Sequence, residues 1–465
     1  MTSIACIDQG TSSTRCLVVE DGGVWRQVAS LKHQEHYPAL SWVEHDAEEL
    51  LGNIKTVLAA AGRVDGIAIA NQGESCLAWD ALTGQPLSPV VVWKDSRTSA
   101  HLASMPQDAH SLSRNVCGLP LDPYFSASKL AWLLGTLPAV ARAFEAGTLR
   151  LGTTDAFFLD RLTGNFVTDL TTASRTGLLD LQTGHWSNAL CSLHGVPMQC
   201  LPRIASAGEP LGAIDGVPVL ASVVDQQAAL FGHGCRHPGA CKITFGTGAF
   251  LLAVAGSERP TAQDLLPTIA WADREDGLTY AIEGGVYDAG AALAWAHQIG
   301  LYSAVQDLDT FDGPSALSRG LVFVPAFSGL AAPHWDRHAA PLFIGMGHST
   351  NRRDMIRAVL EGIALLTATL VKRADHLVSL GDTISIDGGL SQSTYFAQFL
   401  ASACGKTIVV PATHEMTSIG LAELCGVNVT PARASGRRFA PHDPVSAAHH
   451  ELFETAIAHA RDWPR

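Results

Sequence analysis

The stretch from Ile4 to Val19, IACIDQGTSSTRCLVV, is an apolar run that breaks into a polar turn and then resumes. This pattern predicts two strands joined by a tight hairpin. The turn is rich in glycine and hydroxyl residues, so backbone N–H groups and side-chain oxygens can face phosphate oxygens there. Asp8, at the end of the first expected strand, is placed to meet the hard cation that accompanies such phosphates. A polar hairpin turn without a ligand explains this stretch alone equally well.

The same pattern returns near the middle of the chain. Residues Lys242 to Val254 read KITFGTGAFLLAV, which is an apolar run, the turn Gly246-Thr247-Gly248 and a second apolar run. Two strand–turn–strand hairpins of this kind indicate an internally duplicated chain. If the two halves face each other, both hairpins can address one polyphosphate in the cleft between them.

Composition argues against several classes of protein. A chain of 465 residues gives a soft expectation of roughly three domains, but the duplication favours two large ones. Hydrophobic residues make up 47% and charged residues 16%, as in a soluble globular protein with an ample core. The formal charge of −13 and the lack of a Lys/Arg run argue against a nucleic-acid partner. The ten cysteines have neither disulfide nor zinc spacing.

No stretch of the sequence predicts a membrane segment. Asp8 interrupts the only apolar run near the N-terminus, so we expect no signal peptide. The most apolar expected helix, Met355 to Val371, carries Arg357 and Glu361 and is too short and polar to cross a bilayer. We therefore expect a cytoplasmic protein with no membrane partner.

Residues with useful chemistry fall at the ends of expected strands. Glu74 and Trp93 end two strands of the first half, and Asp225 follows the buried strand 217–224. Ligands collect at such strand ends in open α/β sheets. We place a domain boundary just beyond, which gives an N-terminal domain of residues 1–234 and a C-terminal domain of residues 235–465.

Several stretches, in a fixed order, resemble one known family. They are DQGTSSTR at 8–15, WDALTGQPLSPVVVWKDSRT at 79–98, PYFSASKLAWLL at 123–134, TDLTTASRTGLLDL at 168–181, VVDQQAALFGHG at 223–234, FGTGAFLL at 245–252, VPAFSGLAAPHWD at 324–336 and IDGGLSQS at 386–393. In these stretches the chain resembles the FGGY carbohydrate kinases, and within that family the glycerol kinases. The motifs of other nucleotide-binding folds, G-x₄-G-K-[ST] and G-x-G-x-x-G, are missing.

The resemblance implies a fold and an activity. The fold is α/β and actin-like, with two ribonuclease-H-like domains and a cleft between them. The N-terminal domain would bind the polyol or sugar together with phosphate, and the C-terminal domain would bind the nucleotide. The activity is ATP-dependent, Mg²⁺-requiring phosphorylation of a small polyol, foremost glycerol to glycerol 3-phosphate. Assembly into a homo-oligomer, a dimer or a tetramer, is also implied.

Asp225 is our candidate for the general base. Phosphoryl transfer to a hydroxyl needs a carboxylate that accepts the proton as the O–P bond forms. Within VVDQQ, Asp225 matches the catalytic acid of the family. The alternative is a helix N-cap, because Asp ahead of Gln-Gln-Ala-Ala suits that position.

The remaining site residues are carried over from the resemblance, position by position. Asp8 would hold Mg²⁺; Thr11, Ser12, Ser13, Arg15, Gly246 and Thr247 would lie at the phosphates; Gly290, Gly389 and Ser393 would approach the nucleotide; and Glu74, Trp93, Tyr124, Asp225, Gln226 and Phe250 would bind the acceptor. Carboxylates and a phenol suit hydroxyl groups, and an aromatic wall suits a carbon chain. The alternatives are plain turns or close helix packing for the glycines, and core positions for Trp93 and Phe250.

The sequence departs from the glycerol kinase pattern at Gly73. Glycerol kinases have Arg there, in N-Q-R-E-[TS], and use it to hold the terminal hydroxyls, whereas this chain reads N-Q-G-E-S. Lys94 is a candidate to restore the positive charge. Ser393 stands in place of an Asn and Ala294 in place of a Gln. Two alternatives therefore stay open, a kinase for a longer polyol or a ketose that fills the vacated space, and a non-catalytic regulatory or binding protein of the same fold.

Overall fold

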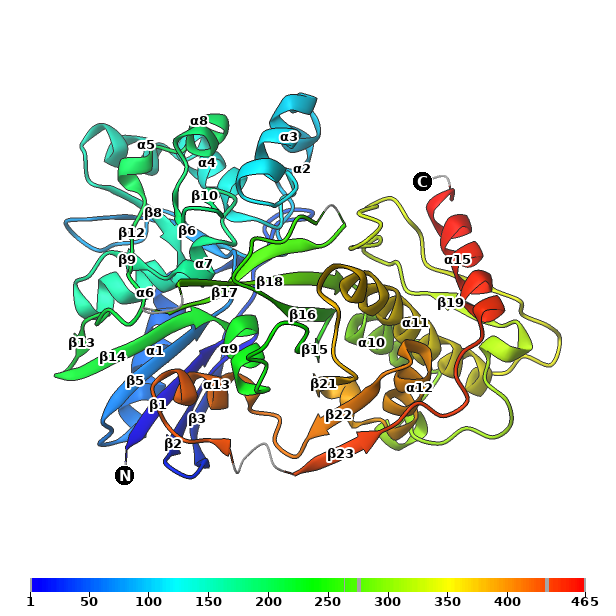
Figure 1. Ribbon diagram of the computed structural model, residues 1–465. Helices are drawn as coiled ribbons and strands as arrows, with labels where there is room; N and C mark the ends of the chain where they lie inside the picture. The colour runs from blue at the N-terminus through cyan, green and yellow to red at the C-terminus, as the bar shows by residue number, and fades with distance from the viewer. Residues whose placement is uncertain (1, 263, 274–276, 431–434, 464–465) are drawn as a thin grey trace.

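Two mixed β-sheets, one in each half of the chain, form the framework of the molecule (Figure 1). The computed structural model describes residues 2–262, 264–273, 277–430 and 435–463. The six strands of the first sheet are, in spatial order, β13 (Ala213–Ile214), β14 (Val217–Val224), β5 (Gly66–Asn71), β1 (Ser3–Gln9), β2 (Ser13–Glu20) and β3 (Val24–Lys32). The second sheet consists of β17 (Leu266–Asp273), β18 (Gly277–Val286), β16 (Ala249–Gly256), β15 (Cys241–Phe245), β21 (Thr383–Gly388), β22 (Thr407–Pro411) and β23 (Gly436–Phe439).

The two sheets repeat one topology. In the first, β1 runs antiparallel to β2 and parallel to β5, which in turn is parallel to β14. In the second, β15 runs antiparallel to β16 and parallel to β21, which is parallel to β22. The two expected hairpins, β1–β2 and β15–β16, therefore occupy equivalent places, and the predicted duplication is confirmed.

Helices cover the sheets with apolar faces that repeat at helical spacing. In α1 (Ala47–Ala61), Asp46 caps the N-terminus by accepting a hydrogen bond from the Glu49 N–H, and Leu50 and Ile54 are fully buried against the first sheet. The long helix α11 (Arg352–Val378) begins with a capping box of Asn351 and Asp354 and packs on β16 and β18 of the second sheet.

A third, smaller sheet in the N-terminal half contains β4 (Glu44–His45), β7 (Val90–Val91), β6 (Cys76–Asp80) and β8 (Leu149–Thr153). The other elements of this half are α2 (Ser99–Ala103), α3 (Gln107–Val116), α4 (Ser126–Thr136), α5 (Pro138–Glu145), α6 (Thr154–Thr163), β9 (Val167–Thr168), α7 (Leu170–Ala173), β10 (Leu179–Asp180), β11 (His185–Trp186), α8 (Asn188–His194) and β12 (Arg203–Ile204). The C-terminal half adds α10 (Gly290–Gln298), β19 (Val322–Val324), β20 (Leu342–Ile344), α12 (Thr394–Cys404), α13 (Met416–Leu424) and α15 (Ala447–Arg461).

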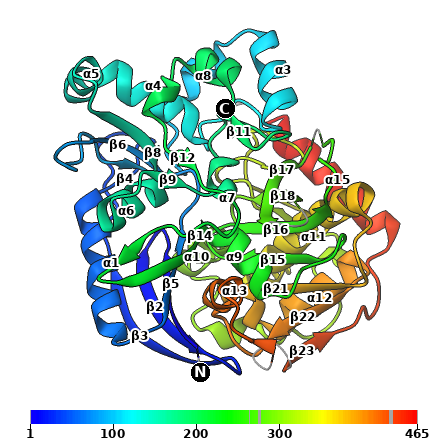
Figure 2. The same cartoon turned by 60° about the vertical axis from the view of Figure 1, so that its left-hand side comes forward.

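Two helices lie side by side between the sheets (Figure 2). The first, α9 (Asp225–Gly232), connects β14 of the first sheet to β15 of the second. The second, α13, comes from the C-terminal half, but its Ile419 and Leu421 pack in one core cluster with Ile4 of β1. The chain therefore passes between the halves more than once. The predicted boundary after residue 234 lies directly beyond α9, and it stays a prediction. Within the described ranges, no helix combines the length and the apolar character that crossing a membrane requires.

Candidate active site

The carboxyl ends of the parallel strands bring part of the predicted site together. In the first sheet, the register pairs Gln9 of β1 and Val224 of β14 with Asn71 of β5, so the three strands end side by side. In the second sheet, Phe245 of β15 pairs with Gly388 of β21. The polar turns that follow these strands therefore meet at common sheet edges, as expected for ligand sites in α/β proteins.

Between the two halves lies a cavity of about 160 Å³. It is lined by Thr11, Gln72, Gly73, Glu74, Trp93, Tyr124, Arg175, Val224, Asp225, Gln226, Thr244, Gly246, Thr247, Gly248, Phe250 and Glu283. All six predicted acceptor-binding residues are among these. The volume is well below the roughly 300–1,000 Å³ of pockets for drug-sized ligands, so the cavity suits a compound of a few carbon atoms.

Three aromatic rings form one wall of this cavity. Trp93 lies edge-on to Tyr124 and to Phe250, with ring centroids 5.6 Å and 6.2 Å apart. The indole Nε1 of Trp93 donates a hydrogen bond to Thr11 Oγ1 at 3.0 Å. The fully buried Lys129 holds this wall from behind, because its Nζ donates to the backbone carbonyls of Tyr124 (3.0 Å) and Val92 (3.3 Å). The wall is therefore fixed in place and still reaches the cavity.

Asp225 is the first residue of α9 and is half-buried at the cavity. The N-cap of α9 is Val224, so the alternative interpretation of Asp225 as a helix N-cap is wrong. Burial and the charge of Asp8 raise the pKa of Asp225 to about 7, although the cationic Lys242 acts in the opposite direction. A carboxyl group with a pKa near neutrality has the property that a general base needs.

Glu74 is held in an uncommon backbone conformation beside the cavity. Its φ is 61°, in the left-handed region, and the side chain is 5% exposed. Ser126 Oγ donates to the Glu74 carbonyl at 2.9 Å, and Arg175 Nε donates to Glu74 Oε1 at 2.6 Å. Burial raises the pKa of Glu74, and Arg175 opposes that effect. Such backbone strain persists where the surroundings enforce it, and it concentrates at functional sites.

The first hairpin turn exposes the groups predicted to meet phosphate. Ser12 is exposed and Ser13 is half-buried, while the Gly10 N–H donates to the Ser13 carbonyl and closes the turn. Arg15 lies between two carboxylates, 3.4 Å from Asp8 Oδ2 and 3.3 Å from Glu415 Oε1. Burial raises the pKa of Asp8, and the Arg15 charge opposes this shift. The arrangement leaves hydroxyls and a guanidinium at the surface of the turn.

The second hairpin turn rests on the start of α10. Gly246 and Thr247 are exposed, and their carbonyls accept hydrogen bonds from Gly290 and Ala289. A Cβ on Gly290 would lie 2.4 Å from the Gly246 carbonyl oxygen, so glycine is required there by close packing. The contact of Gly290 with a nucleotide stays a prediction.

The two remaining nucleotide candidates differ in their surroundings. Gly389 is exposed, and a Cβ built on it would meet open space. Ser393 is buried; its Oγ donates to the Leu308 carbonyl at 2.8 Å and caps α12 by accepting from the Phe396 N–H. Neither residue lines the 160 Å³ cavity. Their role at the nucleotide therefore also stays a prediction.

The sequence reasoning missed a buried charge cluster. Arg175, within the stretch TDLTTASRTGLLDL at 168–181, lines the cavity and pairs with Glu74 and with Glu283 of β18. In the sequence, the one feature that could have indicated this cluster is the charge of Arg175 among small and apolar neighbours. Lys94 does not take this place, because its Nζ pairs with Glu35 at 2.6 Å.

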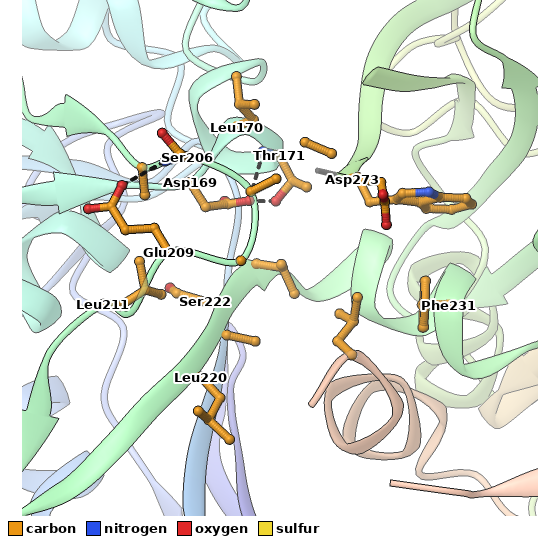
Figure 3. A pocket seen from close by; sticks show the side chains of 18 of the residues that line it. Asp169, Leu170, Thr171, Ser206, Glu209, Leu211, Leu220, Ser222, Phe231 and Asp273 are labelled. Carbon is orange, nitrogen blue, oxygen red and sulfur yellow. Dashed lines mark hydrogen bonds between the residues drawn. The ribbon is translucent and has the colours of Figure 1, made fainter. Parts of the chain in front are cut away.

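A larger cavity, of about 770 Å³, lies between β14, β17 and the ends of α9 and α13 (Figure 3). Its acidic groups have partners within the protein. Asp169 accepts hydrogen bonds from the Thr171 and Thr172 N–H groups, and Glu209 pairs with Arg203. The described residues that line it include none of the predicted site residues. The predicted acceptor-binding residues line the smaller cavity instead.

The residues present fit a magnesium nucleotide. Among the described residues, no group of three or more His, Cys, Asp or Glu side chains could hold a metal by itself. Mg²⁺ is commonly held by one or two carboxylates together with substrate phosphates. Asp8 offers one carboxylate. Its negative charge raises the pKa of Asp225, and a cation bound at Asp8 would offset this repulsion between the two carboxylates.

A duplicated sheet topology, with two equivalent strand–turn–strand hairpins and a small cavity between the two halves, defines the class of actin-like phosphotransferases. Residues 3–232 match the model for the N-terminal domain of the FGGY family of carbohydrate kinases, and residues 241–429 match the model for its C-terminal domain. The chain therefore belongs to the FGGY family of carbohydrate kinases. It is an ATP-dependent carbohydrate kinase that uses ATP with Mg²⁺, and the predicted fold and enzyme class are confirmed.

Individual relatives cover nearly the whole chain. The glycerol kinase of Bordetella parapertussis is 37% identical over 451 residues, with 92% of this chain and 88% of that protein covered. The glycerol kinase of Alkalilimnicola ehrlichii is 35% identical, with 100% and 99% covered. The crystal structure of Plasmodium falciparum glycerol kinase with ADP superimposes with a TM-score of 0.88 at 28% identity, covering 100% of this chain and 99% of that one.

Proposed function

We propose that this kinase transfers the terminal phosphoryl group of ATP to glycerol, which gives glycerol 3-phosphate, with Asp225 as the general base. The observation that carries the proposal is the 160 Å³ cavity, in which the carboxylates of Glu74 and Asp225 face an aromatic wall. Full-length relatives named as glycerol kinases, at 35–37% identity, support the choice of glycerol. Two solved xylulose kinases, from Lactobacillus acidophilus and Brucella ovis, are 21% and 24% identical and support the fold alone.

Asp225 would accept the proton of the attacking hydroxyl. Transfer of a phosphoryl group depends mainly on positioning and charge stabilisation, and a carboxylate at the nucleophile supplies the proton acceptor. Lys242 Nζ donates to Gln226 Oε1 at 2.5 Å, which orients the residue next to Asp225. Glu74 and the aromatic wall would hold the other end of the acceptor in a fixed direction.

The nucleotide would lie across both hairpins. Asp8 would hold Mg²⁺, and Thr11, Ser12, Ser13, Arg15, Gly246 and Thr247 would surround the phosphates. When bound, Mg²⁺ supplies positive charge that stabilises the phosphate oxygens during transfer. A cytoplasmic location, assembly into a homo-oligomer and the alternative of a longer acceptor stay predictions, whereas membership of the FGGY carbohydrate kinases speaks against the alternative of a non-catalytic protein.

The pH profile tests the role of Asp225. Since burial and Asp8 raise its pKa to about 7, Asp225 is protonated below that pH and cannot accept a proton. We expect kcat/KM to rise with pH through about 7 and then to level off, which is the sign expected for a base that must be ionised. The measurement is steady-state kinetics across this range, with excess Mg²⁺ to keep the nucleotide in one form. A profile that is flat on both sides of pH 7 would contradict the assignment.

The choice of acceptor is tested by a substrate panel. We expect the highest kcat/KM with glycerol, and lower values with erythritol, xylitol and xylulose, measured by ADP release. Gly73→Arg should gain little for glycerol, because its Cβ would lie 3.1 Å from Val224 Cγ1 and because Arg175 already lines the cavity. A wild-type preference for a larger acceptor, with glycerol activity recovered in Gly73→Arg, would instead favour the longer polyol or ketose. Absence of ADP release with every acceptor of the panel would contradict the proposed reaction.

A further inference from the structure

One arm of the Arg175 guanidinium has no hydrogen-bond partner in the part of the chain that the structure describes. Nε donates to Glu74 Oε1 at 2.6 Å, and Nη2 donates to Glu283 Oε1 at 2.7 Å. Nη1 is buried and has no hydrogen-bond partner among the described residues. The side chain is 1% exposed and lines the 160 Å³ cavity. Two arms therefore fix the plane of the guanidinium, and the third is left for another group.

A second buried donor at the same cavity is also unpartnered. Gln72 Oε1 accepts a hydrogen bond from Ser75 Oγ, which orients the amide, and Gln72 Nε2 has no partner in the described part of the chain. Buried polar groups in folded proteins are almost always hydrogen-bonded, because leaving a donor unpaired is costly. Two such donors at one small cavity point to a ligand that carries hydrogen-bond acceptors.

We propose that Arg175 Nη1 binds a hydroxyl oxygen of the acceptor in the cavity that Gly73 also lines. This inference rests on the proposed function, since it names a specificity-determining residue for that reaction. Gly73 provides no side chain, and Lys94 is engaged by Glu35, so Arg175 is the cation that the described residues place at the cavity beside Glu74. The planar fork of arginine binds two carboxylates in fixed directions, which a lysine ammonium cannot reproduce.

The anchors of Arg175 come from both halves of the molecule. Glu74 follows β5 of the first sheet, and Glu283 lies in β18 of the second. The direction of Nη1 therefore depends on both halves being in place around the acceptor. Arg175 also lies near the ring of Tyr124, with Cζ 5.8 Å from the ring centroid. A hydroxyl bound by Nη1 would thus lie beside the predicted acceptor-binding residues.

The test compares Arg175→Lys with a matched control, Arg97→Lys. The Arg97 side chain is equally buried and pairs with Glu44 and Asp95. Its Nη1 also lacks a hydrogen-bond partner within the described ranges, but Arg97 does not line the cavity. We expect Arg175→Lys to raise KM for glycerol by roughly ten- to a hundredfold, the range of a lost hydrogen bond to a charged group, with a smaller change in kcat. Arg97→Lys should lower stability while leaving KM unchanged. Equal changes in KM for both variants would overturn the proposal.

Deoxy analogues identify the hydroxyl. Propane-1,2-diol lacks one terminal hydroxyl of glycerol, and propane-1,3-diol lacks the central one. With the diol that lacks the bound hydroxyl, wild type and Arg175→Lys should have similar KM values, whereas with glycerol and the other diol they should differ. A constant factor between the two enzymes for all three compounds would show a merely structural effect and would also overturn the proposal.

Two provisions keep the result unambiguous. If Arg175→Lys does not fold, the substitution is made together with Glu283→Gln, which leaves one cation opposite the one remaining carboxylate, Glu74. The KM values of this double variant are then compared with those of the single variant Glu283→Gln. If wild type does not phosphorylate glycerol, the proposed substrate fails by itself. KM is then compared for the acceptor that the panel selects and for its deoxy analogues. Equal changes in KM for Arg175→Lys and Arg97→Lys, or a constant KM factor across all the compounds, would again overturn the role of Arg175.

Discussion

Asp225→Asn is expected to lower kcat by about 10²–10⁴-fold, the typical contribution of a positioned general base. The amide keeps the size and shape of the side chain at the start of α9, but it cannot accept a proton at neutral pH. It also removes a charge that repels Asp8, so the variant should be no less stable than the wild type. Initial rates with saturating glycerol and Mg²⁺-ATP measure the effect, and thermal unfolding checks the fold.

Asp169→Asn is the matched control for that experiment. Asp169 is likewise half-buried, and desolvation raises its pKa to about 6, but it caps α7 at the larger cavity. Since Asn is nearly as good an N-cap as Asp, this variant should keep the fold and the turnover of the wild type. Turnover of Asp225→Asn within tenfold of wild type would rule out Asp225 as the base. Comparable losses in both variants would mean that the effect is structural.

The sequence was sufficient to predict residues that lie at strand ends. Glu74, Trp93 and Asp225 each follow a recognisable apolar run. The parallel strands β5 and β14 deliver Glu74 and Asp225 to one edge of the first sheet, whereas Trp93 follows β7 of the smaller antiparallel sheet. The duplicated hairpins likewise predicted two sheets of one topology. These features depend on local pattern and on chain order, which are visible in the sequence.

The contacts of Arg175 could not be predicted in this way. Its hydrogen bonds to Glu74 and Glu283 join residues 101 and 108 positions apart. No local pattern specifies which carboxylate a buried guanidinium will meet, because that depends on how the two halves are placed. Likewise, the short apolar sequence of α13 does not indicate which sheet the helix packs on. In the structure it packs on the first sheet, in one cluster with Ile4.

The contact between α9 and α13 leads to the second large prediction. A Cβ on Gly420 of α13 would lie 1.8 Å from the Ala228 carbonyl oxygen, and a Cβ on Gly232 of α9 would lie 1.9 Å from the Met416 carbonyl oxygen. The two helices therefore touch backbone to backbone. Because the obstructing atoms are backbone, Gly420→Ala forces the helices apart, and we expect a loss of about 3 kcal/mol in the free energy of unfolding, at the upper end for overpacking.

Gly52→Ala is the matched control, since Gly52 lies inside α1 and a Cβ there meets nothing within 4 Å. This variant should gain about 0.5–1 kcal/mol in the free energy of unfolding, because alanine loses less backbone entropy in a helix.

Gly420→Ala should also lose turnover at temperatures where it is folded. Ala228 lies one turn after Asp225, and misplacing a catalytic group by 1 Å can lower the rate by about 10²-fold. Denaturant unfolding and kcat, measured on both variants, give the two effects separately. Wild-type stability in Gly420→Ala would mean that the helices are not in backbone contact, and normal turnover despite lower stability would mean that α13 does not position Asp225.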